Sequence, residues 1–424
     1  MARLEAAATT KTQAPEPRGV RVVIDVRPLQ EPERSPLTAA YLDSLLRAFA
    51  AAPREGESFV LVTRTLRDDP TERLAAAGLP IAGLRRLPPT TRALRSAGLT
   101  LDSFLLRGAE VGVAVADEPA VFHTAGGAVP LASRLPVVAT LLDLAPWELP
   151  ETYAATAAAR FGHRLRARVL HDAACVIVCS RAVGDEARRH LHLPPEKMSV
   201  IPLAVDDDFR AAGRDEAAVA ATRTRLGLPD RYLAFAGRYD ARKDVKTLFE
   251  ALAAIRDEGK PEPAVVFAVD AAHREDADLV IRGAARYGLV ETVKPVIVDG
   301  VADRAALIAG ARAFVYPAVS EATALPVLEA LSLGVPVICS RIGALPEAVA
   351  SSGIVVSPRD AARLAAAIEA IWSGGALAEQ LRTQGRNRAR TRVRTWADVA
   401  RETRAAYAAA AFPTTPPFLL GPAS

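Results

Sequence analysis

The sequence lacks the features that mark several common protein classes. Its 424 residues include three cysteines, too few for a disulfide framework, so a reducing compartment fits best and we expect a cytoplasmic protein. No apolar run is long enough to cross a bilayer, and residues 1–17 have no apolar stretch like that of a signal peptide. The net charge is only +4, and nothing indicates nucleic acid as a partner.

Nucleotide-binding and metal-binding motifs are also scarce. The chain has neither a phosphate loop with its lysine nor a Gly-x-Gly-x-x-Gly motif, which removes the usual evidence for an ATPase or a simple dehydrogenase. Cys175 and Cys179 flank an expected buried strand but are too far apart to share zinc. No third ligand follows from the sequence near His190 and His192, and the acids at 206–208 point in different directions. We therefore predict no metal site.

Short β-branched runs alternate with longer Ala- and Leu-rich periodic stretches along nearly the whole chain. This alternation is typical of parallel sheets with crossover helices, and the length favours two domains. The sequence therefore predicts an α/β fold with two doubly wound, Rossmann-like domains that face a cleft. The expected strands are 20–26, 58–63, 120–123, 136–142 and 175–179 in the first half, and 232–236, 264–269, 295–298, 313–316, 335–339 and 353–356 in the second.

We expect the domain boundary between Pro202 and Asp230, where a strand ends in Val-Asp-Asp-Asp-Phe at 205–209 and a polar helix leads to Leu-Gly-Leu-Pro. Near the other end, Trp396, Val399, Thr403 and Tyr407 recur at helical spacing, and such an apolar stripe needs a surface to cover. We expect a disordered segment at 1–17, a first domain at 18–205, a second domain at 206–390, a helix at 391–411 that returns to the first domain, and a flexible tail at 412–424.

The stretch from 316 to 347 contains two informative acids. Glu329 is the only charge in an expected helix that is otherwise apolar, so a structural donor or the hydroxyls of a ligand must satisfy it, and we favour the ligand. Glu321 lies in the loop after an expected buried strand, where ligands of open α/β sheets bind. The sequence therefore indicates that both carboxylates face one cleft.

A second informative stretch begins at Gly237, where a buried strand is expected to end. The glycine permits close approach, and Arg238 and Lys243 follow just before an amphipathic helix. Two cations beside a helix N-terminus favour a diphosphate site. A surface turn, with Arg242 and Lys246 as further solvated charges, is the alternative.

Together these motifs resemble the retaining glycosyltransferases of the GT-B fold, in particular family four (group 1). The resemblance covers most of residues 20–410 and includes the segment GVPVICSRIGALPE. It implies that Arg238 and Lys243 bind the diphosphate of a UDP- or GDP-linked sugar and that Glu329 binds the ribose. It also implies that Glu321 contacts the transferred sugar, without any metal or further cofactor.

In the first half, VFHTAGG and VVATLLDLAPWELPETY resemble the family's histidine loop and the segment after it. The resemblance implies that His123 lies near the transferred sugar, whereas a histidine that closes a strand for structural reasons is the alternative. The acceptor is an unidentified glycan, lipid or small molecule, because its contacts come from variable loops. The arginine-rich segment 160–168 leaves open a weak contact with anionic lipid, although a solvated helix face fits better.

The chain departs from the family pattern at three places around the expected cleft. Ala322, Thr323 and Ala324 stand where the family has Gly-Phe-Gly. The loss of both glycines narrows the backbone conformations available to this loop, in which amides near Ala324 and Leu325 would approach the donor. Leu142 stands where a histidine is common, and the glycine-rich turn after the first strand is replaced by residues 33–38. The alternative to an active hexosyltransferase is therefore a non-catalytic, donor-binding subunit that supports an active partner.

Overall fold

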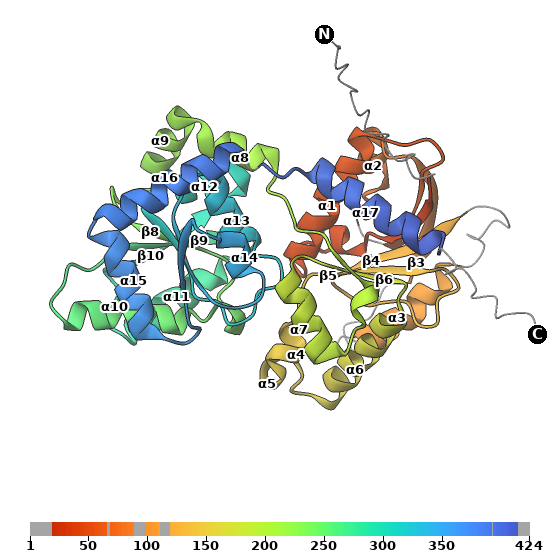
Figure 1. The fold of residues 1–424 in the computed structure, drawn as a ribbon, viewed down its shortest axis with the longest axis horizontal. Coiled ribbons are helices and arrows are strands. Elements are labelled where there is room, and N and C mark those ends of the chain that lie inside the picture. Colours follow the sequence, from red (N-terminus) through yellow and green to blue (C-terminus); the bar gives the residue numbers. More distant parts are fainter. Residues whose placement is uncertain (1–18, 66–67, 89–97, 111–118, 392, 414–424) are drawn as a thin grey trace, which may run out of the picture.

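Two α/β domains lie side by side in the computed structural model (Figure 1). The structure describes residues 19–65, 68–88, 98–110, 119–391 and 393–413. The first domain contains a seven-stranded sheet and the second a six-stranded sheet, and the strand pairs in both are parallel. The predicted fold class is confirmed. The expected segment at 1–17 and all but the first two residues of the expected tail at 412–424 lie outside the described residues.

The sheet of the first domain has the order β3-β2-β1-β4-β5-β6-β7. The chain order reverses between β1 and β4, so their carboxyl ends flank the crevice where doubly wound sheets bind ligands. The central strands are buried along their length, because helices cover both faces of a parallel sheet. The strands are β1 (Arg21–Asp25), β2 (Ser58–Arg64), β3 (Ile81–Leu87), β4 (Ala120–Ala125), β5 (Val137–Leu141), β6 (Cys175–Val178) and β7 (Met198–Val200).

The sheet of the second domain has the order β10-β9-β8-β11-β12-β13, with the corresponding reversal between β8 and β11. The expected cationic and acidic stretches both begin at this reversal, because one follows β8 and the other follows β11. The strands are β8 (Leu233–Ala236), β9 (Val265–Asp270), β10 (Val293–Val298), β11 (Ala313–Tyr316), β12 (Val337–Ser340) and β13 (Gly353–Val356).

Helices fill the connections between these strands. Among those described, none combines the length and apolar character that a transmembrane span requires. The first domain contains η1 (Arg27–Gln30), α1 (Pro36–Ala51), α2 (Thr71–Ala76), α3 (Gly98–Gly108), α4 (Ala145–Glu148), α5 (Pro150–Tyr153), α6 (Ala157–Asp172), α7 (Arg181–Leu191) and η3 (Pro195–Lys197). The second contains α8 (Asp207–Arg214), α9 (Glu216–Arg225), η4 (Ala241–Lys243), α10 (Val245–Asp257), η5 (Ala271–His273), α11 (Glu275–Ala285), α12 (Gly300–Ala309), α13 (Leu325–Ser332), α14 (Leu345–Val349), α15 (Ala361–Trp372) and α16 (Ala376–Thr391).

The two edge strands of the first sheet differ from the prediction, since β3 was missed and β7 was expected to end further along the chain. β3 contains Gly83, Arg85 and Arg86, which are not typical of a buried strand, and most of its residues are partly exposed. β7 has only three residues. The strand expected to end at 205 was placed wrongly, since β7 ends at Val200 and residues 201–206 form neither helix nor strand. Edge strands lack the two-sided burial that makes a sequence pattern clear.

The last helix, α17 (Trp396–Ala411), lies on the first domain rather than on the second. In Figure 1 it runs beside α1, and its contacts include β4 and β5. Thr395 and Asp398 form a capping box that begins the helix. The ring of Trp396 lies 5.9 Å from that of Tyr41, and the buried Arg404 guanidinium donates to both carboxylate oxygens of Glu57 at 2.7 and 2.8 Å. The chain therefore crosses between the domains twice.

We predict that Arg404→Met destabilises the first domain by about 3–5 kcal/mol, because it leaves the buried Glu57 carboxylate without its partner. Chemical unfolding followed by circular dichroism measures the loss. Arg401→Met is the matched control: this arginine lies on the same helix with its side chain 59% exposed, so the change should stay within about 0.5 kcal/mol. Equal stability of the two variants would contradict the assigned role of Arg404.

Candidate active site

The chain turns sharply after β8 and places Lys243 against the backbone at Gly237. Gly237 has φ of 150°, and a Cβ there would lie 3.7 Å from Lys243 Cε. The intervening turn is fixed by Asp240, whose side chain accepts from the Arg242 amide. The lysine is therefore buried, and its Nζ donates to Tyr316 Oη at 2.5 Å and to Glu321 Oε2 at 2.7 Å.

Glu321 is the centre of this hydrogen-bonding cluster. Its Oε2 also accepts from Tyr316 Oη at 2.8 Å, while Oε1 accepts from the hydroxyl of Thr323 and from the backbone amides of Thr323 and Ala324. Burial alone would raise the pKa of Glu321, but the Lys243 ammonium and the other donors outweigh it and lower the pKa to about 2. Glu321 is thus ionised at neutral pH and holds a fixed negative charge; it has no proton to donate.

The loop from 321 to 324 is held by a close approach of the segment after β12. A Cβ at Gly343, where φ is 47°, would lie 2.0 Å from Glu321 O, so only glycine fits this position. Next to it, the amide of Ala344 donates to the same carbonyl at 3.1 Å. Ala324 has φ of 56° and precedes Leu325, the first residue of α13. The left-handed conformation is thus retained here without glycine.

Arg238 lies at the same strand end but is directed toward α11. Its Nε donates to Asp276 Oδ2 at 2.7 Å, and Asp276 also accepts from the Tyr239 amide. The side chain of Arg238 is 37% exposed and that of Asp276 is 5% exposed. A buried carboxylate therefore orients a half-exposed guanidinium, and no hydrogen bond among the described residues joins Arg238 to Lys243.

Glu329 on α13 has a structural donor. Arg304 on α12 donates to Glu329 Oε2 at 2.5 Å, which is the alternative that we ranked second to a ligand. Burial raises the pKa of Glu329, although the ion pair with Arg304 opposes that effect. Glu329 Oε1 has no hydrogen-bond partner among the described residues. Each of the two acids thus has its own cation, Lys243 for Glu321 and Arg304 for Glu329.

His123 is part of the core of the first domain. It lies on β4 with 0% exposure, its Nε2 is 3.0 Å from Thr140 Oγ1, and its Nδ1 is 2.6 Å from Tyr407 Oη. Burial lowers the pKa of His123 to about 3 and outweighs the opposing effect of Asp25. With both ring nitrogens occupied and no exposed surface, His123 does not reach the cleft in this structure. Its placement matches the structural alternative, because α17 covers it.

Polar contacts close the cleft between the domains. Arg242 reaches from the second domain to Asp143 of the first at 3.4 Å, and Ser320 donates to Glu148. Glu347 accepts from the amides of Arg181 and Ala182 at the start of α7, a favourable place for a carboxylate. Arg242, taken in the alternative interpretation as a solvated charge, is instead a bridge between domains.

A cavity of about 290 Å³ lies beside these contacts. Its lining comes from both domains and includes Cys179, Ser180 and Leu203 from the first, and Ala324, Leu331 and Ala348 from the second. The cavity reaches the loop that follows Glu321 but is not lined by Lys243 or Arg238. It is therefore a space at the crossing between the domains rather than the cation site itself.

The arginine-rich segment at 160–168 is not wholly solvated. Arg166 is buried, and its guanidinium lies 5.1 Å from the ring centroid of Trp147. His163 packs against the same ring at 5.8 Å. The interpretation of this segment as a solvated helix face is thus wrong for Arg166, because α6 packs its apolar side, together with Arg166, against the first domain.

Two family models match the chain on either side of the domain boundary. Residues 12–209 match the model of Glycosyltransferase Family 4, and residues 230–374 match that of Glycosyl transferases group 1. The chain belongs to the family-four, group 1 glycosyltransferases. Among curated relatives, O-antigen chain mannosyltransferase B of Escherichia coli is 28% identical over 233 residues; the match covers 54% of this chain and 60% of that relative. The chain thus spans less than two thirds of this relative's length.

Solved structures share the fold of this family member at low sequence identity. Sucrose-phosphate synthase from Thermosynechococcus elongatus has a TM-score of 0.66 at 21% identity, with 92% of this chain and 98% of that chain covered. An Anabaena protein in complex with UDP and glucose has a TM-score of 0.64 at 15% identity, with 91% and 98% covered. These likenesses show the GT-B arrangement of two Rossmann-like domains.

Several residues of the site in this glycosyltransferase escaped the sequence interpretation. Tyr316 was assigned only as the end of a strand, and Asp276 and Arg304 lie on other helices, far from the motifs that they support. Thr323 was considered only as part of the altered Gly-Phe-Gly loop, whereas its hydroxyl donates to Glu321. The one available signal was Tyr316, because a hydroxyl at the carboxyl end of a buried strand points into the crevice.

We predict that the stability of the protein falls on acidification partly through His123. A histidine whose pKa is depressed in the folded state contributes stability above its unfolded pKa, and this contribution is lost as the pH falls toward the folded value. From pH 7 to pH 5, the parent should lose about 2 kcal/mol more than His123→Gln, given an unfolded pKa of about 6.5. Unfolding at both pH values tests this, and the exposed His192→Gln should behave like the parent.

We also predict that Ala324→Gly raises stability by about 1 kcal/mol, since glycine adopts the left-handed conformation without a Cβ clash. Ala322→Gly is the matched control in the same loop. Its backbone is not in the left-handed region, so glycine there should lower stability by a similar amount through chain entropy. Melting temperatures that move in the same direction for both variants would show that the conformation at Ala324 carries no strain.

Proposed function

We propose that this protein is a retaining glycosyltransferase that moves a hexose from a nucleoside-diphosphate sugar to an acceptor. The observation that carries the proposal is the cluster of Lys243, Tyr316 and Glu321 at the carboxyl ends of β8 and β11, the edge where α/β sheets bind ligands. The mannosyltransferase name of one relative and the UDP and glucose bound by one structural neighbour support this substrate class.

The proposed roles follow from charge and exposure. Arg238 is half-exposed and held by Asp276, so its guanidinium is pre-oriented for a phosphate. Lys243 supplies a second positive charge from within the site, and together the two cations stabilise the departing diphosphate without a metal. The fixed negative charge of Glu321 stabilises positive charge that develops at the anomeric carbon. The amides after Ala324 approach the donor.

For the ribose we assign Glu329. Arg304 holds one of its oxygens, which leaves the other to accept from a diol. UDP and GDP fit this arrangement equally, since the base lies beyond the residues discussed. The acceptor is a glycan, lipid or small molecule that binds on the side of the first domain, and we propose that the transfer takes place in the cytoplasm.

One observation favours the second candidate, a non-catalytic subunit that binds the donor and supports an active partner. No histidine reaches the cleft from position 123 or 142. His123 is buried in the core, and position 142 carries a buried leucine. A protein of this kind would keep the nucleotide site in the second domain and lose the chemistry at the first.

Donor hydrolysis and nucleotide affinity, measured for the parent, Glu321→Gln and Glu329→Gln, test the assignment. Glu329→Gln should weaken nucleotide binding about tenfold, because one charge-assisted hydrogen bond becomes neutral. Glu321→Gln should slow hydrolysis and leave nucleotide affinity nearly intact, because the carboxylate acts in the transition state. The retained affinity would also show that the second domain of Glu321→Gln is folded.

The cation site has its own control in this experiment. UDP or GDP should raise the melting temperature of the parent, with EDTA present, and Arg238→Ala should remove most of that shift. Arg274→Ala, which removes an exposed cation beside α11, should retain the shift.

Unchanged binding after loss of both Arg238 and Lys243 would refute the diphosphate site. Equal hydrolysis by the parent and Glu321→Gln would refute the catalytic role, and nucleotide binding without turnover would favour the non-catalytic subunit.

A further inference from the structure

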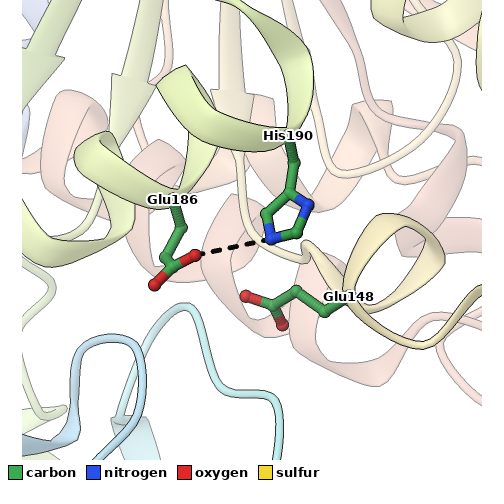
Figure 2. A group of neighbouring side chains, drawn as sticks. All are labelled: Glu148, Glu186 and His190. Carbon is green, nitrogen blue, oxygen red and sulfur yellow. Dashed lines mark ion pairs between the residues drawn. The ribbon is translucent and has the colours of Figure 1, made fainter.

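Three side chains with metal-ligand atoms meet at the edge of the first domain that faces the second (Figure 2). They are Glu148 at the end of α4 and Glu186 and His190 on α7, and one ligand atom from each lies within 4.8 Å of the others. Glu186 and His190 are four residues apart and therefore share one face of the helix. His190 Nε2 is 3.4 Å from Glu186 Oε2. The sequence suggested no further ligand near His190, and the fold brings Glu148 to it from a separate element.

The group borders an open space in which an ion and its water ligands have room. A cavity of about 380 Å³ is lined by Glu148 and Glu186 of the first domain and by Val319, Ile342 and Gly343 of the second. The three side chains are partly buried, so an ion could enter from this cavity without any rearrangement of the core.

The nearby protein cations do not neutralise the two carboxylates. Arg341 lines the same cavity, but no ion pair joins it to Glu148 or Glu186 in the part of the chain that the structure describes. Glu186 pairs with Arg189 at 3.0 Å, whose side chain is 67% exposed, and such surface pairs contribute little. Glu148 accepts a hydrogen bond from Ser320. Two like charges therefore lie together at a half-buried place.

We propose that Glu148, Glu186 and His190 bind a divalent transition-metal ion, with Zn²⁺ as the preferred ion. One imidazole and two carboxylates form a ligand set typical of zinc and its neighbours, and water from the cavity completes the coordination. Mg²⁺ and Ca²⁺ prefer sites made only of oxygen atoms. The ion would join α4 to α7, and through the hydrogen bond of Ser320 to Glu148 it would also stabilise the contact with the second domain.

This site goes beyond the proposed function and does not depend on it, because its ligands are separate from the cations assigned to the diphosphate. The test is a calorimetric titration of the metal-stripped full chain with Zn²⁺. We expect one ion per chain and at least tenfold weaker binding by Glu148→Gln and by His190→Asn. The matched controls are Glu151→Gln on the neighbouring α5 and His192→Asn two residues further along, and both should bind as the parent does.

Cobalt gives a second measurement that separates this site from the three buried cysteines. Co²⁺ bound to the parent should show visible bands of nitrogen and oxygen coordination without the near-ultraviolet absorption of a cobalt–thiolate bond, and His190→Asn should abolish those bands. Zn²⁺ affinity unchanged in both Glu148→Gln and His190→Asn would overturn the proposal. So would thiolate absorption, or Mg²⁺ binding as tight as that of Zn²⁺. Nucleotide binding by the metal-stripped chain reports separately on the donor site.

Discussion

The buried carboxylate of Glu321 is the constraint on which the organisation of the second domain depends. An ionised carboxylate is costly to bury unless charged and polar donors surround it, and five hydrogen bonds from Lys243, Tyr316, Thr323 and Ala324 meet that requirement. These donors come from the ends of two neighbouring strands and from the loop before α13. The ion pair thereby joins the cationic turn after β8 to the acidic loop after β11.

The same requirement explains why the backbone around Glu321 is so restricted. Gly237 adopts a φ of 150°, which L side chains rarely adopt. Gly343 allows the next loop to approach the carbonyl of Glu321. Ala324 keeps a left-handed conformation in which its amide donates to the carboxylate. Ala322 and Ala324 stand where related loops have glycine, and Thr323 stands where they have phenylalanine. The loop nevertheless keeps its left-handed turn at Ala324 and gains a hydroxyl donor to Glu321.

In the first domain, the returning helix α17 covers polar groups of the sheet and of neighbouring segments and so removes them from the cleft. Tyr407 closes over His123, and Arg404 neutralises Glu57, so these polar groups belong to the packing between α17 and the sheet. The face toward the second domain carries Asp143, Glu148 and the start of α7 instead. Polar contacts of this kind between domains are compatible with opening and closing of a cleft.

One sequence was enough to predict the fold class and the central strands of both sheets, and to single out Gly237, Lys243 and Glu321 as candidate site residues. Those features depend on local periodicity and on chemistry within short motifs, which one sequence displays. Which of these groups meet is visible only in the folded chain. Four pairings illustrate this: Arg304 with Glu329, Asp276 with Arg238, α17 over His123, and Glu148 with His190. None of them follows from sequence spacing, because each joins separate elements. Edge strands such as β3 were missed for the same physical reason, since their pattern is set by what covers them.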